Sequence, residues 1–162
     1  MENNTPEFRI GELLRRLGWR LATAESCTGG LIGHRLTNVP GSSDYYLGGI
    51  IAYANPVKQA LLGVRAETLD QHGAVSRETV LEMARGVRTA LAAEAGLSVS
   101  GIAGPGGGTP IKPVGLVWIG LSLPGCEQAW KFHFQGDRLQ VKEQAAEQAL
   151  ALLENLLAEQ VF

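Results

Sequence analysis

The stretch RLATAESCTGGLIGHRLTNV, residues 20–39, decides the fold, because a strand, a tight turn and a helix follow one another in it. Residues 20–24 have the short apolar character of a strand. Gly29 and Gly30 come next, and glycine lets the backbone turn sharply and other groups approach closely. Residues 31–39 predict a helix that the following Pro-Gly pair ends. A strand joined directly to a helix is a building unit of α/β proteins.

Strands and helices alternate through the rest of the chain. Hydrophobic periodicity and turn residues predict helices at 8–17, 31–39, 57–62, 76–95 and 138–159, and strands at 20–24, 45–54, 97–102, 115–123 and 128–134. Thr5, Ser76 and Asp137 are expected to mark the starts of the first, fourth and last of these helices. We therefore expect an α/β protein that forms a three-layer α/β/α sandwich around a mixed, mostly parallel sheet. A single domain is expected to span residues 1–162.

The composition is that of an ordinary globular protein with a slight negative charge. Hydrophobic residues make up 45% and charged residues 19% of the chain, and the net charge is −2. Proteins that bind nucleic-acid phosphates normally carry a surplus of basic residues, so no nucleic-acid partner is expected. Cys27 and Cys126 are expected to be free thiols of a cytoplasmic protein. Neither an export signal nor a membrane-spanning apolar run is recognisable, so no membrane partner is expected.

The turn Ala-Glu-Ser-Cys-Thr-Gly-Gly at residues 24–30 is the first candidate site. The first turn of a helix has unpaired N–H groups and the positive end of the helix dipole, which together attract anions. Ser26 and Thr28 would add hydroxyl donors; the alternative is an ordinary helix cap without a ligand. Cys27 could act as a nucleophile, but no histidine stands in the sequence context of a cysteine hydrolase. We expect Cys27 to be a packing residue.

The sequence Asn55-Pro56-Val57-Lys58 places a lysine at the start of a predicted helix. With Asn55 as the N-cap and Pro56 as the first helical residue, Lys58 takes the third helical position. The helix dipole and partial burial would lower its pKa, so that a neutral amine could accept a proton from a serine hydroxyl. The alternative is a lysine on a solvent-facing helix. The spacing leaves open which serine lies beside Lys58.

A glycine-rich segment at residues 100–108 follows a predicted buried strand. Its backbone amides could bind a carboxylate, an oxyanion or a phosphate, and a purely structural loop is the alternative. Arg138, at the start of the last helix, could clamp a phosphate, although a surface residue is the simpler interpretation. No His or Cys pair has the spacing of a zinc site, so no metal is expected.

Several of these stretches resemble the motifs of one known family, in the same order. They are Ala-Glu-Ser-Cys-Thr-Gly-Gly at 24–30, Gly-Ser-Ser at 41–43, Tyr-x-Asn-x-x-Lys at 53–58, His-Gly-Ala-Val-Ser at 72–76, Ser-Gly-Ile-Ala-Gly-Pro at 100–105, Lys-Pro-Val-Gly at 112–115 and Gly-Asp-Arg at 136–138. The chain is similar, over nearly its whole length, to the CinA C-terminal domain family, the PncC-type nicotinamide mononucleotide amidohydrolases. The resemblance does not extend to the N-terminal nucleotide-pyrophosphatase-like domain of full CinA proteins, so the activities of that domain are not expected of this chain.

The resemblance implies hydrolysis of nicotinamide mononucleotide to nicotinate mononucleotide and ammonia by a Ser/Lys dyad, without a cofactor. Lys58 would be the base and Ser43 the preferred nucleophile, with Ser26 as the rival nucleophile or a proton relay. Tyr53 would orient the dyad or the nicotinamide ring. The residues expected to hold the nucleotide and its phosphate are Thr28, Gly29, Gly30, Ser100, Gly101, Gly104 and Arg138. The resemblance also implies a homo-oligomer.

Two other functions are compatible with the sequence. A non-catalytic nucleotide-binding or regulatory domain, linked to competence or DNA damage, would keep the glycine loops but tolerate loss of the lysine. A cysteine amidase would depend on Cys27 and would not need Ser43.

Overall fold

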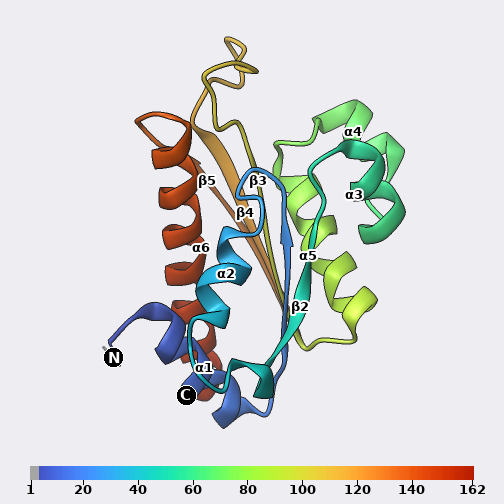
Figure 1. The fold of residues 1–162 in the computed structure, drawn as a ribbon. Coiled ribbons are helices and arrows are strands. Elements are labelled where there is room, and N and C mark those ends of the chain that lie inside the picture. The colour runs from blue at the N-terminus through green and yellow to red at the C-terminus, as the bar shows by residue number, and fades with distance from the viewer. Residues whose placement is uncertain (1–3) are drawn as a thin grey trace.

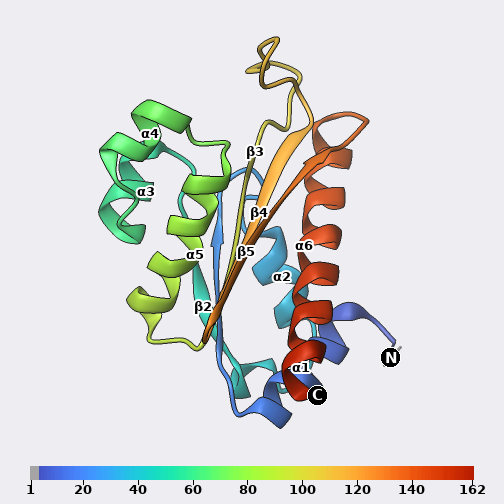
Figure 2. The ribbon, with the colours of Figure 1, turned by 180° about the vertical axis from the view of Figure 1, so that it is seen from behind.

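The computed structural model describes residues 4–162 and has a sheet between two layers of helices (Figure 1 and Figure 2). The five strands, in the spatial order β2-β1-β3-β4-β5, are β1 (Leu21–Glu25), β2 (Tyr46–Ile51), β3 (Ala95–Gly101), β4 (Leu116–Leu123) and β5 (Cys126–His133). β1 pairs in parallel with β2 and β3, whereas β4 pairs antiparallel with β3 and β5. Every strand except β4 therefore points the same way. The predicted three-layer α/β fold with a mixed sheet is confirmed.

The helices cover the sheet on both faces, as the two opposite views make clear. One face carries α1 (Pro6–Leu17), α2 (Leu31–Thr37) and α6 (Arg138–Val161), and the other carries α3 (Asn55–Leu62), α4 (Ala66–His72) and α5 (Arg77–Leu91). α6 packs on β3 and β4, α5 packs on β1, β3 and β4, and the shorter helices pack against α6 or α5. Between residues 4 and 162, no helix combines the length and the apolar character needed to cross a membrane.

The core has one part on each face of the sheet. Leu97 and Ile119 belong to the part under α6, and Ala22 belongs, with Val80 and Met83 of α5, to the part on the opposite face. All five residues of β1 are buried. A central parallel strand covered on both faces needs apolar or small residues at every position, which explains why residues 21–24 show no polar alternation.

Three helix starts predicted from capping residues are confirmed. The hydroxyl of Thr5 accepts a hydrogen bond from the N–H of Phe8 in α1, and that of Ser76 accepts one from Thr79 in α5. Asp137 forms a capping box with Gln140 at the start of α6. Each bond satisfies an N–H that has no partner inside the helix.

Two details of the predicted elements are wrong. α5 ends at Leu91 rather than at residue 95, because Ala92 takes a left-handed conformation with φ of 54° and its N–H closes the last turn. Ala95 and Gly96 therefore open β3 instead of closing the helix. α4 was not predicted, because it has only seven residues and too few turns to display an apolar period.

The carboxyl ends of β1, β2 and β3 lie side by side at one edge of the sheet. Glu25, the last residue of β1, is in register with Ile51 of β2 and Val99 of β3. From this edge the chain leaves β1 toward α2 on one face and leaves β2 toward α3 on the other. Ligand sites of open α/β sheets form where neighbouring connections diverge in this way. The fold thus points to the segments that follow these strands.

Candidate active site

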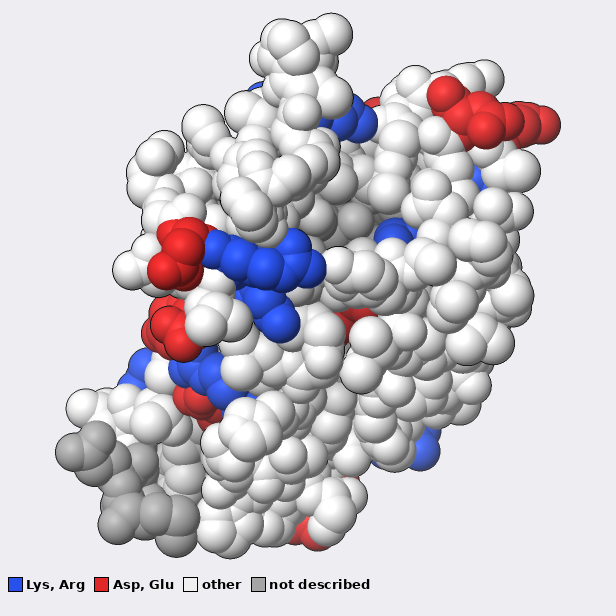
Figure 3. Space-filling model, turned by 45° about the horizontal axis from the view of Figure 1, so that its top comes forward, with Lys and Arg blue, Asp and Glu red and all other residues white. Residues whose placement is uncertain are grey.

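A cavity of about 240 Å³ lies at the carboxyl ends of these strands. The residues singled out from the sequence that line it are Ser26, Cys27, Tyr53, Asn55, Lys58, Ser100, Gly101 and Arg138. Figure 3 looks onto this end of the molecule, where Lys and Arg side chains gather beside a hollow. The fold therefore brings together motifs that are far apart in the sequence.

Lys58 is the most unusual residue of this cavity, because only 1% of its surface is exposed. Its Nζ lies 3.0 Å from Ser26 Oγ, 2.9 Å from the carbonyl oxygen of Ala52 and 3.1 Å from that of Tyr53. No carboxylate in residues 4–162 forms an ion pair with it. The interpretation of Lys58 as a solvent-facing lysine is excluded.

The start of α3 explains why the amine points into the cavity. Side chains of a helix lean toward its N-terminus, so a lysine in the first turn reaches back over the segment that precedes the helix. Ala54 is the N-cap and α3 begins at Asn55, which makes Lys58 the fourth helical residue. The prediction of Asn55 as the N-cap is therefore off by one residue, since Ala54 is still extended, with φ of −93° and ψ of 151°.

Burial lowers the pKa of Lys58, because a charged ammonium loses hydration in the cavity wall. The two carbonyl oxygens can only accept hydrogen bonds, so the amine donates to both. A neutral amine then has its lone pair left for the third neighbour, the hydroxyl of Ser26. This is the arrangement required of a base that takes a proton from serine.

Ser26 is the first residue after β1, and β3 holds it in place. Its N–H donates to the carbonyl oxygen of Val99 over 3.0 Å, which continues the β1–β3 pairing. The N–H groups of the next two residues, Cys27 and Thr28, make no backbone hydrogen bond with any part of residues 4–162. Free backbone donors directly after a nucleophile can stabilise an oxyanion.

Glu25, which was not singled out from the sequence, organises this turn. Its carboxylate is 3% exposed and accepts hydrogen bonds from the Thr28 hydroxyl (2.6 Å) and from the N–H groups of Ile32 (2.9 Å) and Gly33 (3.1 Å). Two of the N–H groups at the start of α2, which were expected to bind an external anion, thus donate to a carboxylate of the protein itself. The sequence did contain a signal for this role: Glu25 stands shortly before a predicted helix, and carboxylates stabilise helix N-termini.

The predicted pairing of Ser43 with Lys58 is not found. Ser43 is exposed and lies in the short 3₁₀ helix Ser42–Asp44, just before β2 begins. Lys58 follows the other end of β2, and a six-residue strand spans about 20 Å. The length of β2 therefore separates Ser43 from the amine of Lys58. Ser26, and not Ser43, is the serine that lies beside this amine.

Arg138 connects two segments at the cavity mouth. It donates from Nη2 to the Tyr53 hydroxyl over 2.9 Å and from Nη1 to the carbonyl oxygen of Gly104 over 2.6 Å. The Tyr53 side chain is 60% exposed, and its backbone carbonyl, not its hydroxyl, contacts Lys58. Arg138 is thus part of the site and not an isolated surface residue.

Thr28, Gly29 and Gly30 line a second cavity of about 370 Å³ instead of the first. The Thr28 hydroxyl already donates to Glu25, so it is not a free donor. Gly29 and Gly30 have positive φ angles of 60° and 102°, which glycine adopts without strain. Consecutive residues line the two cavities, since Cys27 lines the first and Thr28 the second.

Cys27 and Cys126 are both free thiols, as predicted. Burial raises the pKa of Cys27 to about 12, so the thiol stays protonated at neutral pH. A thiol that is not ionised is a poor nucleophile, which agrees with the packing role predicted for it. Within residues 4–162, no group of three or more His, Cys, Asp or Glu side chains is arranged to hold a metal ion.

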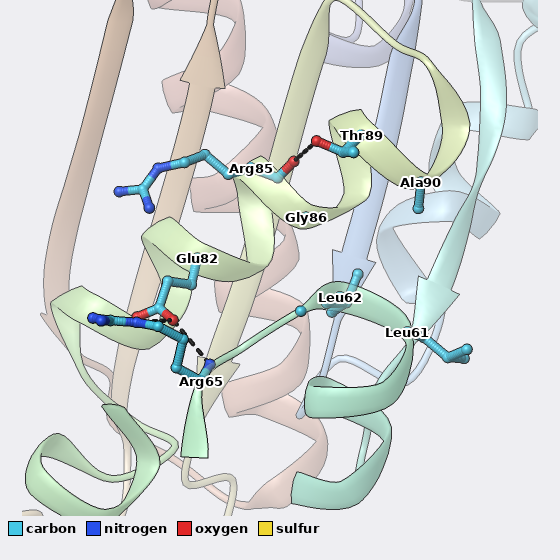
Figure 4. A pocket seen from close by; sticks show the side chains of 9 residues that line it. Leu61, Leu62, Arg65, Glu82, Arg85, Gly86, Thr89 and Ala90 are labelled. Carbon is cyan, nitrogen blue, oxygen red and sulfur yellow. Dashed lines mark hydrogen bonds and ion pairs between the residues drawn. The ribbon is translucent and has the colours of Figure 1, made fainter. Parts of the chain in front are cut away.

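A larger hollow of about 530 Å³ lies between α3 and α5, away from these groups (Figure 4). Its polar side chains include Arg65 and Glu82, which form an ion pair at 3.4 Å. Gly86 of α5 faces the carbonyl of Leu62 at this contact, and a side-chain carbon at Gly86 would lie only 1.8 Å from that oxygen. The hollow has no nucleophile beside a base, so the cavity around Ser26 and Lys58 is the candidate active site.

The comparisons with known proteins agree on one family. The family model for the CinA C-terminal domain matches residues 3–157. A CinA-like protein of Chloroherpeton thalassium is 52% identical over 155 residues, which cover 93% of this chain and 37% of the relative. A CinA-like protein of Nostoc sp. is 50% identical over 168 residues, which cover 97% of this chain and 40% of the relative. The chain thus spans little more than a third of the length of these curated relatives.

Solved structures match the chain almost completely. A competence-damaged protein (CinA) superfamily protein from Klebsiella pneumoniae superposes with a TM-score of 0.91 at 38% identity, over 95% of this chain and 96% of that one. A competence/damage inducible protein from Agrobacterium tumefaciens superposes with a TM-score of 0.84 at 40% identity, over 91% and 95% of the two chains.

Proposed function

Because the chain belongs to the CinA C-terminal domain family, we propose that it is an amidohydrolase that converts nicotinamide mononucleotide into nicotinate mononucleotide and ammonia. One observation carries the proposal: the buried amine of Lys58 lies 3.0 Å from the hydroxyl of Ser26 in a cavity at the strand ends. Lys58 is the base and Ser26 the nucleophile.

In the first half of the proposed reaction, Ser26 is acylated. Neutral Lys58 accepts the proton of the Ser26 hydroxyl while Oγ attacks the carboxamide carbon. The backbone N–H groups of Cys27 and Thr28 stabilise the oxyanion of the tetrahedral intermediate. The lysinium then protonates the departing nitrogen, so that ammonia leaves, the C–N bond breaks and an ester with Ser26 remains.

Water completes the cycle. Lys58, neutral again, takes a proton from a water molecule, whose oxygen attacks the ester carbon. Collapse of the second tetrahedral intermediate breaks the bond to Ser26 Oγ, which regains its proton from Lys58. The carboxylic acid formed loses its proton to solvent and leaves as nicotinate mononucleotide.

The remaining predicted residues form the walls of the site. Ser100 and Gly101 line the cavity beside the dyad, and we propose that the nicotinamide ring binds there. Arg138 keeps Tyr53 and Gly104 in position around it. Gly29 and Gly30 line the second cavity, which takes the ribose and phosphate.

A non-catalytic binding domain explains Lys58 less well. Burying an amine without a carboxylate partner costs stability, and a domain that only binds a nucleotide gains nothing from that cost. A lysine that acts as a base needs both its burial and the absence of a carboxylate partner, because both keep the amine neutral. The chemistry of Lys58 therefore favours the enzyme.

The test is ammonia release from nicotinamide mononucleotide by the purified protein. Ser26→Ala is expected to lose several powers of ten in turnover, on the scale seen when a catalytic nucleophile is removed. Ser43→Ala is the matched control and is expected to keep its activity, as is Cys27→Ala. Failure of the wild type to release ammonia between pH 6 and 10 would favour the binding domain. Equal losses in folded Ser43→Ala and Ser26→Ala would reject the assignment of Ser26.

A further inference from the structure

The start of α6 carries two cations, Arg138 and Lys142, and its N-cap is Asp137, whose carboxylate caps the helix and forms no ion pair with either cation. Four residues separate them, which places both on one face of the helix. The first turn of α6 contains no acidic residue, and neither cation forms an ion pair with any residue between 4 and 162. Two like charges near the positive end of a helix dipole are unfavourable. An anionic ligand would attract both cations and so offset this unfavourable energy.

Lys142 lies against the glycine turn that follows Ser26. A side-chain carbon at Gly29 would lie 3.7 Å from Lys142 Nζ, so the ammonium is directly over this residue. Lys142 is half-buried and lines the cavity of about 370 Å³ together with His34. Glu143 also lines that cavity but is exposed and forms no ion pair with Lys142 within residues 4–162.

Consecutive residues of two segments line the two cavities. Cys27 and Arg138 line the cavity of the dyad, and the next residues along the chain, Thr28 and Leu139, line the cavity of Lys142. Gly29 is three residues from Ser26, and three residues span at most about 11 Å. A nucleotide bridges a comparable distance between its base and its phosphate.

The two cations are not equally free to bind a ligand. Arg138 already donates to Tyr53 and to Gly104 from its two terminal nitrogens. The ammonium of Lys142 makes no hydrogen bond with a side chain or backbone group of residues 4–162. We propose that Lys142 binds the phosphate monoester of the substrate and makes the site select a nucleotide over the corresponding nucleoside. This inference rests on the proposed function.

The activity test compares two substrates that differ only in the phosphate, nicotinamide mononucleotide and nicotinamide riboside. A lost charge-assisted hydrogen bond corresponds to about 10- to 100-fold in binding. Lys142→Gln is therefore expected to raise the KM for the mononucleotide by about that factor, with little change in kcat. Activity on the riboside should not change, and Lys142→Arg should retain most of the preference. Lys131→Gln, an exposed lysine on β5, is the control.

A binding test separates this inference from the proposed function. Ribose 5-phosphate is titrated into the wild type and Lys142→Gln by calorimetry, which needs no amidase activity. Binding that depends on Lys142 supports the inference even if nicotinamide mononucleotide is not hydrolysed. Equal binding to both proteins, or no binding to the wild type, overturns it. An unchanged preference for the mononucleotide over the riboside in active Lys142→Gln also overturns it and leaves the amidase proposal intact.

Discussion

Ser26 Oγ and Lys58 Nζ lie 3.0 Å apart although 32 residues separate them in the chain. Each follows a strand, and the two strands are parallel neighbours, so both side chains emerge at the same edge of the sheet. Backbone contacts fix both of them: Ser26 donates to Val99, and Lys58 donates to Ala52 and Tyr53. The dyad is therefore positioned by backbone contacts at and just beyond the strand ends, which suits a site that must hold a nucleophile against its base.

The rate should rise with pH. Only neutral Lys58 can accept the proton of Ser26, and the pKa of Lys58 is lowered from the ordinary value of 10.5 by burial. The neutral fraction grows as pH rises through the lowered pKa, so kcat/KM for nicotinamide mononucleotide should climb and level off below pH 10.5. Lys58→Arg should be inactive throughout, because a guanidinium stays charged. A kcat/KM that falls between pH 6 and 9 would contradict this.

Glu25→Ala should destabilise the protein and weaken catalysis. The substitution leaves the buried N–H groups of Ile32 and Gly33 without their acceptor. A buried donor without a partner costs about 1–3 kcal/mol, so the free energy of unfolding in urea should fall by at least that amount. The turn that carries Ser26 loses its anchor, so kcat should fall as well. Exposed Glu12→Ala in α1 is the control, with an expected change within about 0.5 kcal/mol. Equal stabilities of the two variants would refute the role given to Glu25.

Gly86→Ala should shift α3, the helix that carries Lys58, although Gly86 itself lies outside the active site. The added carbon would lie 1.8 Å from the carbonyl oxygen of Leu62, so α3 and α5 must move apart. Overpacking of this kind costs about 1–3 kcal/mol, measured as a loss of unfolding free energy. Lys58 sits on the same helix as Leu62, so turnover should also fall.

Gly106→Ala is the matched control for this substitution. A side-chain carbon at Gly106 meets no atom within 4 Å, so stability should be unchanged. If Gly86→Ala behaved like Gly106→Ala, the close packing of α3 on α5 would not be what positions Lys58.

Local patterns were sufficient to predict most of the fold. Thr5, Ser76 and Asp137 marked helix starts because capping depends on a few neighbouring residues. The apolar run at residues 20–24 predicted a strand, and the structure adds that this strand is buried on both faces. The predicted end of α5 was wrong because alanine is rarely expected in the left-handed conformation of Ala92.

The candidate site depended on contacts that local patterns do not contain. The motif around Lys58 predicted a lysine with a lowered pKa, but its partner is set by the pairing of β1 with β2. Ser43 is closer to Lys58 in sequence than Ser26 is, yet β2 lies between Ser43 and Lys58 and keeps them apart in space. Glu25 was missed because its role depends on the path of the turn back over the start of α2.

Titration of Lys58 itself shows whether its amine is neutral when the enzyme works. NMR of protein labelled at lysine Cε, with Lys58→Met to assign the signal, follows the charge of this amine as pH changes. We predict a midpoint below 10.5, and we expect Ser26→Ala to leave the amine buried and its pKa still lowered. A midpoint at or above 10.5 would mean that Lys58 stays charged under working conditions and cannot be the base that activates Ser26.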